Sequence, residues 1–267
     1  MKKSPIVLLA ICLWLLLNGC GINSSEDSRQ RVTSVDTTPN DSMDIPYNAP
    51  PKVPKIDDMK LHNSEVAYCL THHRQSPINL NTPGKKAAHT LTFNYVSSHE
   101  VVKNLGHTVE LEYDKGSSVV FDDKTYQLIQ FHFHTPSEHR IDAERYPMEA
   151  HLVHQAADST FLVISLLFEE KKENTFLKRF INDIPKTAGD STEKSREIDL
   201  TKFFPSDQRF YTYSGSLTTP PYTEGVRWVI FKQPVNCSKT QLDIFKKTEG
   251  FNARKLQPMN LRKLEEF

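Results

Sequence analysis

From residue 59 onward the chain is divided into short runs of β-branched and aromatic residues, with turn residues between them. Runs of this length and content are typical of β-strands, and a succession of them restricts the chain to a sheet-based fold. Helical periodicity is sparse and gives candidates only at residues 173–181 and 239–247. The sequence therefore predicts a β-rich domain. Its predicted strands are residues 90–95, 108–113, 117–121, 126–134, 149–155, 161–168 and 226–231.

The length and charge of the chain limit its organisation and its partners. A chain of 267 residues allows one large or two small domains, and we favour one. Lys plus Arg and Asp plus Glu both total 33, so the formal net charge is zero. Because no excess of positive charge is present to hold a polyanion, we expect no nucleic-acid partner.

Residues 1–19 have the organisation of a secretory signal peptide. Two lysines precede an unbroken apolar run over residues 6–17, which is shorter than the roughly 20 residues of a membrane-spanning helix. The segment ends with the residues LNGC at 17–20. This ending resembles a bacterial lipobox, which implies cleavage before Cys20 and acylation of its thiol. The alternative is an ordinary secretory signal in which Cys20 is incidental.

Residues 20–58 are rich in Ser, Thr, Asp and Pro and contain almost no large apolar side chain before Tyr47. Such a segment cannot bury enough surface to offset the entropy of ordering it, so we predict a flexible tether that starts at the lipidated cysteine. Residues 59–267 then form the folded domain. We expect it in the bacterial cell envelope, on the periplasmic or outer-membrane side, with the lipid as its only contact with a membrane.

Two cysteines remain for the folded part of the chain once Cys12 leaves with the signal peptide and Cys20 carries lipid. These are Cys69 and Cys237, and in an oxidising envelope such a pair suggests one disulfide. The alternative of two free thiols stays open, because the sequence does not give the distance between them.

Three histidines on two predicted strands carry the strongest chemical signal. His132 and His134 lie two residues apart and therefore project from the same face of a strand. His151 lies in the run 149–155 and completes a three-histidine set if the two strands are neighbours. Three imidazoles leave tetrahedral zinc one open position, which is typical of catalytic zinc sites. A His-x-His pair alone is more often structural than metal-binding.

Hydrogen-bond acceptors lie where metal-binding histidines need them. Metal-bound imidazoles usually donate their second ring N–H to an amide, a carboxylate or a carbonyl group. Gln130 and Glu149 each precede one of the histidines by two residues, so each can point to the same face. This context favours the metal-binding interpretation over isolated structural histidines.

The chain resembles the alpha carbonic anhydrases in several segments that occur in the family's order. The longest are FHFHTPSEH at 131–139, EAHLVH at 149–154 and YSGSLTTPP at 213–221. Shorter ones are QSPIN at 75–79, NLGH at 104–107, GVRW at 225–228, NAR at 252–254 and QP at 257–258. The resemblance extends over residues 69–262.

The resemblance implies a β-dominated α+β fold, a single domain on a large, mostly antiparallel twisted sheet with short peripheral helices. It implies reversible hydration of carbon dioxide to bicarbonate and a proton by zinc hydroxide. Expected partners are carbon dioxide, bicarbonate, sulfonamide and anion inhibitors, and a second copy in a homodimer. The alternative is a carbonic-anhydrase-like domain without catalysis that acts as a binding or adhesion surface. Such domains typically lose a zinc ligand, whereas this chain keeps all three.

The resemblance also implies roles for the matched residues around the metal. The three histidines would bind Zn²⁺, while Gln130 and Glu149 would orient them. Thr218, held by Glu138, would accept the proton of zinc hydroxide. His107 would carry protons between the site and buffer, since imidazole titrates near neutral pH. The alternative for His107 is an exposed loop histidine without a function.

The remaining matched residues concern the substrate. Thr219 would contact bicarbonate. Several positions depart from the family. Residues 55–68 contain no Trp and no Gly, where family members usually carry both. Tyr222 follows the double proline, where secreted members often carry a cysteine that pairs with one in the Cys69 region. The apolar wall for carbon dioxide would consist of Val153, Val163, Leu217, Val226 and Trp228.

Overall fold

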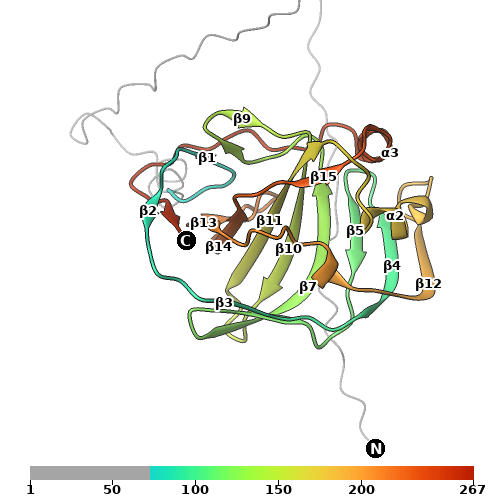
Figure 1. The fold of residues 1–267 in the computed structure, drawn as a ribbon, viewed down its shortest axis with the longest axis horizontal. Helices are drawn as coiled ribbons and strands as arrows, with labels where there is room; N and C mark the ends of the chain where they lie inside the picture. Colours follow the sequence, from blue (N-terminus) through green and yellow to red (C-terminus); the bar gives the residue numbers. More distant parts are fainter. Residues whose placement is uncertain (1–72) are drawn as a thin grey trace, which may run out of the picture. The chain divides into compact units, whose positions relative to one another are not determined.

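The computed structural model describes residues 73–267, which form a large twisted sheet with two short α-helices (Figure 1). The predicted signal peptide, Cys20, the predicted tether and Cys69 lie outside the described residues. Most neighbouring strands are antiparallel; the parallel pairs of the large sheet are β11 with β14, β11 with β15, and β16 with β2. The predicted β-dominated fold on a mostly antiparallel sheet is confirmed.

The continuous path of the sheet brings together strands that are distant in the sequence. Its order is β12 (Ser191–Ile198), β4 (Ser98–Asn104), β5 (Val109–Glu112), β7 (Lys124–His134), β10 (Met148–Gln155), β11 (Phe161–Glu170), β14 (Glu224–Phe231), β13 (Phe210–Ser216), β16 (Glu265–Glu266) and β2 (Lys85–Lys86). Beside this path, β15 (Val235–Cys237) pairs with β11, and β6 (Ser118–Phe121) pairs with β7 and with β3 (Leu91–Asn94). A separate small sheet consists of β1 (Asn79–Leu80), β8 (Arg140–Ile141) and β9 (Glu144–Arg145).

All seven predicted strands are present, with ends that differ from the prediction by at most two residues. The prediction missed the longer strands β4, β12 and β13 and also the strands of two or three residues, which are β1, β2, β8, β9, β15 and β16. β12 lies at the sheet edge, and most of its residues are polar and exposed, so it carries little of the alternation that marks a half-buried strand.

The two faces of β7 are chemically different. Phe131 and Phe133 point to the main apolar core, while His132 and His134 point to the other face. The phenylalanine face packs against side chains from α2 (Leu177–Phe180) and α3 (Lys239–Glu249); for example, the rings of Phe133 and Phe245 have centroids 4.5 Å apart. The helices therefore cover the side of the sheet opposite the histidines.

The first helix is shorter than the predicted 173–181. Asn174 Oδ1 accepts hydrogen bonds from the backbone N–H groups of Phe176 and Leu177, both at 3.0 Å. Asn174 thereby supplies an acceptor for backbone N–H groups at the start of the helix, and α2 begins only at Leu177. The second helix, α3, covers the predicted 239–247 and begins at a Ser238–Gln241 capping box.

Cys237 lies at the end of β15 and is fully buried. Among residues 73–267 it has no disulfide partner, and burial raises the pKa of its thiol to about 12. Since Cys69 lies outside the described residues, the disulfide remains a prediction. No helix in the described part of the chain is long and apolar enough to cross a membrane.

Candidate functional site

β7 and β10 are antiparallel neighbours and bring the three predicted histidines together. His132 lies opposite His151, and His134 lies opposite Glu149. One ring nitrogen from each of the three histidines lies within 4.8 Å of the others. His134 and His151 are buried and His132 is half-buried, so most of the cluster is shielded from solvent.

The hydrogen bonds of two histidines determine which ring nitrogen carries a proton. His132 Nδ1 lies 2.9 Å from Gln130 Oε1, and His151 Nε2 lies 2.8 Å from Glu149 Oε1. An amide oxygen and a carboxylate only accept, so these two nitrogens donate. The unprotonated nitrogens are then Nε2 of His132 and Nδ1 of His151. Gln130 and Glu149 thus lie where the sequence analysis placed them.

Burial keeps the histidine cluster neutral. Desolvation lowers the pKa of His132 well below its ordinary value, lowers that of His134 to about 4, and also lowers that of His151. Neutral imidazoles have lone pairs to offer, whereas a metal must displace the proton of a charged one. Three neutral, buried imidazoles with two oriented tautomers suit Zn²⁺, which prefers nitrogen and sulfur ligands.

Glu149 accepts five hydrogen bonds and connects the cluster to the interior. Besides His151, its donors are the backbone N–H groups of Glu138 and His139, the His139 ring and the Ser165 hydroxyl. Although burial opposes ionisation, the two histidines and these hydrogen bonds hold its pKa well below the ordinary range. The buried carboxylate is therefore charged, and both of its oxygens accept hydrogen bonds.

The sequence analysis missed a chain of polar groups behind Glu149. His139 Nε2 lies 2.7 Å from the Tyr213 hydroxyl, which donates to Ser76 Oγ at 2.8 Å. These contacts span 74 and 137 sequence positions, so no spacing rule predicts them. The only signal in the sequence is that all three residues belong to segments that resemble the family.

Thr218 and Glu138 lie together beside the cluster. Both are buried, and Glu138 Oε2 lies 3.7 Å from His134 Nε2. Burial raises the pKa of Glu138, while His151, the Thr218 side chain and the backbone N–H of Arg254 oppose that rise. The Arg254 N–H donates to Glu138 Oε1 at 2.8 Å.

The predicted apolar wall is a contiguous row on the histidine face. Val153 lies opposite Val163 on β11, and Val163 lies opposite Trp228 on β14. These residues and Val226 form one buried cluster against which Leu217 packs. The Trp228 ring centroid is 4.8 Å from that of His151. Thr219, in the adjacent turn, is exposed.

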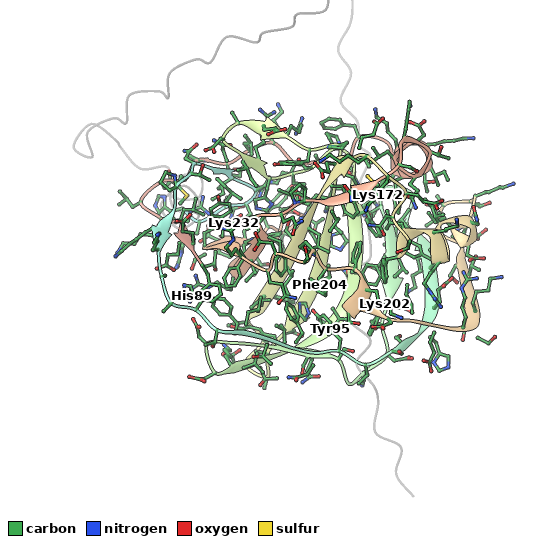
Figure 2. All side chains as sticks on the ribbon, in the orientation of Figure 1. His89, Tyr95, Lys172, Lys202, Phe204 and Lys232 are labelled. Carbon is green, nitrogen blue, oxygen red and sulfur yellow. The ribbon has the colours of Figure 1, made fainter. Side chains whose placement is uncertain are left out.

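His154 lies on β10 but outside the cluster. The register of β10 against β7 shifts between Val153 and His154, and the imidazole hydrogen-bonds with the Tyr95 hydroxyl at 2.8 Å. Figure 2 shows Tyr95 near Phe204, and their ring centroids are 5.8 Å apart. His154 is therefore a buried residue that packs with Tyr95, away from the three clustered histidines.

His107 is exposed in the turn before β5. Its carbonyl accepts from Asn252 Nδ2 at 2.8 Å, and its Nδ1 lies 3.1 Å from the Leu105 carbonyl oxygen. After burial and the two neighbouring histidines, His107 is a further cause of the lowered pKa of His132. It therefore stands within electrostatic reach of the cluster.

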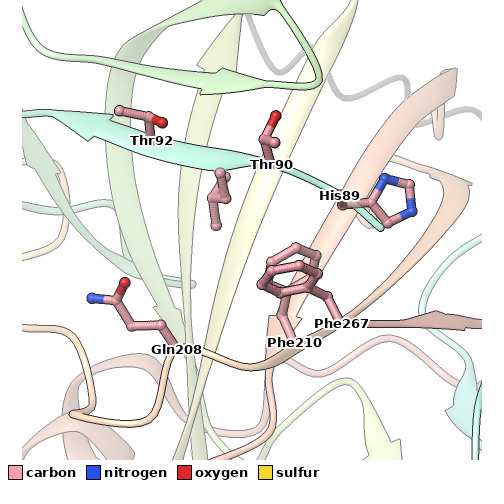
Figure 3. A pocket seen from close by; sticks show the side chains of 7 residues that line it. His89, Thr90, Thr92, Gln208, Phe210 and Phe267 are labelled. Carbon is pink, nitrogen blue, oxygen red and sulfur yellow. The ribbon is translucent and has the colours of Figure 1, made fainter. Parts of the chain in front are cut away.

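Two surface cavities lie elsewhere. The cavity in Figure 3, of about 280 Å³, is lined by His89, Phe210, Phe267 and their neighbours. A second, of about 360 Å³, is lined mainly by basic residues, among them Arg227 and Arg262. None of the three clustered histidines lines either cavity.

Comparison with known proteins agrees with this geometry. The family described as eukaryotic-type carbonic anhydrase matches residues 59–267. A carbonic anhydrase of Pectobacterium atrosepticum is 34% identical over 199 residues, which cover 74% of this chain and 82% of the relative.

Two solved structures are also similar. The alpha carbonic anhydrase of Thermovibrio ammonificans, in complex with the inhibitor sulfanilamide, is 42% identical with a TM-score of 0.70, and the match covers 72% of this chain and 86% of that one. A carbonic anhydrase of Chlamydomonas reinhardtii in complex with acetazolamide is 33% identical with a TM-score of 0.69, covering 74% and 92%. The chain belongs to the alpha carbonic anhydrase family.

Proposed function

We propose that this protein catalyses the reversible hydration of carbon dioxide to bicarbonate and a proton, with one Zn²⁺ held by His132, His134 and His151. The observation that carries the proposal is the set of three neutral, converging imidazoles, two of them with a fixed tautomer. When bound, zinc supplies a nucleophile at neutral pH by lowering the pKa of a water ligand, an effect for which carbonic anhydrase is the standard example.

Thr218 and Glu138 orient the nucleophile. A hydroxyl has one proton, and if Thr218 donates it to the Glu138 carboxylate, its oxygen can only accept from the nucleophile. This arrangement directs a lone pair toward the carbon of the substrate. Thr219 is exposed in the same turn, and we expect it to contact bicarbonate.

The apolar row supplies a place for the substrate. Carbon dioxide is apolar, and the faces of Val153, Val163, Val226 and Trp228 offer apolar surface beside the histidines. A hydrophobic wall also limits the water that competes for the site. We expect sulfonamide and anion inhibitors to bind at this same place.

The experiment measures zinc content and carbon dioxide hydration of the purified domain. We expect one zinc per chain, hydration that is lost on chelation and restored by zinc, and inhibition by sulfanilamide. A protein that binds stoichiometric zinc and does not hydrate carbon dioxide would instead support a binding or adhesion surface. Light scattering on the same sample tests the predicted homodimer.

We propose that His107 transfers protons between the site and buffer. Its exposure and its electrostatic effect on His132 support this role. His107→Ala should lower turnover at low buffer concentration, and added imidazole should restore it. His99→Ala removes another exposed histidine, one paired with Asp114, and serves as the control. Equal turnover in wild type and His107→Ala at low buffer would exclude the role.

We propose that the protein is a lipoprotein of the bacterial cell envelope. The proposal rests on the LNGC ending of the signal peptide and on the polar segment that follows Cys20. Cys20→Ser should abolish lipidation and move the protein out of the membrane fraction. An unchanged mass and unchanged fractionation would reduce Cys20 to an ordinary residue of the signal.

A further inference from the structure

The turn that carries Thr218 has an unusual backbone at Tyr222. This turn, residues 217–223, joins β13 to β14, and Tyr222 has a φ of 60°. Non-glycine residues seldom adopt this left-handed conformation, and they keep it only where surrounding contacts hold it. Within the turn, Tyr222 N–H donates to the Thr219 carbonyl and Leu217 N–H donates to the Thr223 carbonyl, both at 2.9 Å.

Two residues from distant parts of the chain hold Tyr222 from outside the turn. The guanidinium carbon of Arg254 lies 3.6 Å from the centroid of the Tyr222 ring, which is cation–π stacking. Gln75 Nε2 donates to the Tyr222 carbonyl at 3.1 Å. Arg254 Nη1 in turn donates to Gln75 Oε1 at 3.0 Å, so the three residues form a closed set of contacts.

Arg254 also contacts the partner of Thr218. Its backbone N–H donates to Glu138 Oε1, and the Thr218 side chain lies close enough to Glu138 to oppose the rise that burial causes in the pKa of Glu138. Arg254 therefore contacts Glu138, the proposed acceptor of the Thr218 hydroxyl, through its backbone. Through its side chain it contacts the far end of the turn that carries Thr218.

We propose that Tyr222, Arg254 and Gln75 form a clamp that holds the turn 217–223 in the position where Thr218 meets Glu138. The clamp rests on the proposed function, because Thr218 matters for hydration only if it orients the nucleophile. Tyr222 and Gln75 act as positioning residues through Thr218. A hydroxyl that shifts by about 1 Å loses the geometry on which its contribution to rate depends.

The first test compares Tyr222→Leu with Tyr222→Phe. At a φ of 60° leucine and phenylalanine have a similar energetic cost of the left-handed backbone conformation. Only phenylalanine keeps an aromatic face on which Arg254 can stack. We expect Tyr222→Leu to lower kcat/KM by about twofold to thirtyfold, the range that corresponds to the loss of one cation–π contact. Tyr222→Phe should stay within about twofold of wild type, and both should keep stoichiometric zinc.

The second test asks whether the effect passes through Thr218. In a Thr218→Ala background, Tyr222→Leu should change kcat/KM by less than about twofold, because the hydroxyl to be positioned is absent. A full and independent loss in that background would overturn the proposal, since it would place Tyr222 in a general structural role.

The third test does not depend on activity or on metal. Amide hydrogen exchange of metal-free protein reports the turn directly, through the hydrogen-bonded amides of Leu217 and Tyr222. Faster exchange at both amides in Tyr222→Leu, with wild-type exchange in Tyr222→Phe, supports the clamp even if the protein does not hydrate carbon dioxide. Equal protection in all three proteins overturns it.

Discussion

Replacement of Glu149 by glutamine tests the most connected group of the site. Glu149 is fully buried, and its two oxygens have different donors. Oε2 accepts the backbone N–H groups of Glu138 and His139, both at 2.8 Å. Oε1 accepts from His139, His151 and Ser165. Glutamine offers one accepting oxygen and one NH₂ group, so it cannot serve both sets of donors.

Each orientation of the new amide has its own cost. If NH₂ replaces Oε2, two buried backbone N–H groups lose their acceptor, which costs about 1–3 kcal/mol each and about 2–6 kcal/mol together. If NH₂ replaces Oε1, His151 Nε2 must become an acceptor, and the proton moves to Nδ1, the nitrogen proposed to bind zinc. The three groups at Oε1 can become acceptors, His139 and His151 by moving a ring proton and Ser165 by rotating its hydroxyl, whereas backbone N–H groups can only donate. The second orientation therefore preserves more stability and should lower zinc affinity by about 10- to 100-fold.

Two measurements on Glu149→Gln separate these outcomes. Urea unfolding of the metal-free protein gives the change in unfolding free energy, and competition with a chelator gives the zinc affinity. Gln130→Ala is the control, because Gln130 is half-buried and makes one hydrogen bond to the site. It should weaken zinc binding with little loss of stability. If Glu149→Gln kept its stability within about 0.5 kcal/mol and its zinc affinity within about twofold, the reasoning from donors and acceptors would be refuted.

Three further predictions concern other parts of the domain. Thr218→Ala should keep stoichiometric zinc and lose kcat, because it removes an orienting hydroxyl and no ligand; loss of zinc on purification would contradict this. Gly215→Ala should destabilise the domain by about 1–3 kcal/mol in thermal unfolding, because a Cβ would overlap Ser76 Oγ and lie 2.8 Å from atoms of Trp228 and Tyr213; an unchanged Tm would show that these three side chains can move. Burial raises the pKa of Glu249 from 4.5 to about 8, so the folded state holds a proton that the unfolded state releases. The contribution of Glu249 to stability should therefore be complete below about pH 4.5 and be lost at about 1.4 kcal/mol per pH unit up to about 8. Urea unfolding should show that the unfolding free energy of wild type, relative to that of Glu249→Gln, is lower at pH 8 than at pH 5.

The sequence determined those features that depend on neighbouring residues along the chain. The period of two in residues 131–134 placed both histidines on one face of a strand and both phenylalanines on the other, because successive side chains of an extended backbone alternate. The same local geometry placed Gln130 and Glu149 beside their histidines, each two residues away. Seven strand runs with β-branched or aromatic residues were equally predictable, whereas the polar edge strand β12 and the strands β4 and β13 were not.

Only the tertiary structure decided which distant groups meet. The antiparallel register of β7 and β10 brings His151 opposite His132, and without it the third imidazole has no defined place. His139, Tyr213 and Ser76 form one hydrogen-bonded chain behind Glu149, and Arg254 stacks on Tyr222, although these residues lie far apart in the sequence. Side-chain direction follows from the local backbone, but burial, proton position and partner choice arise from packing between segments that only the complete fold brings together.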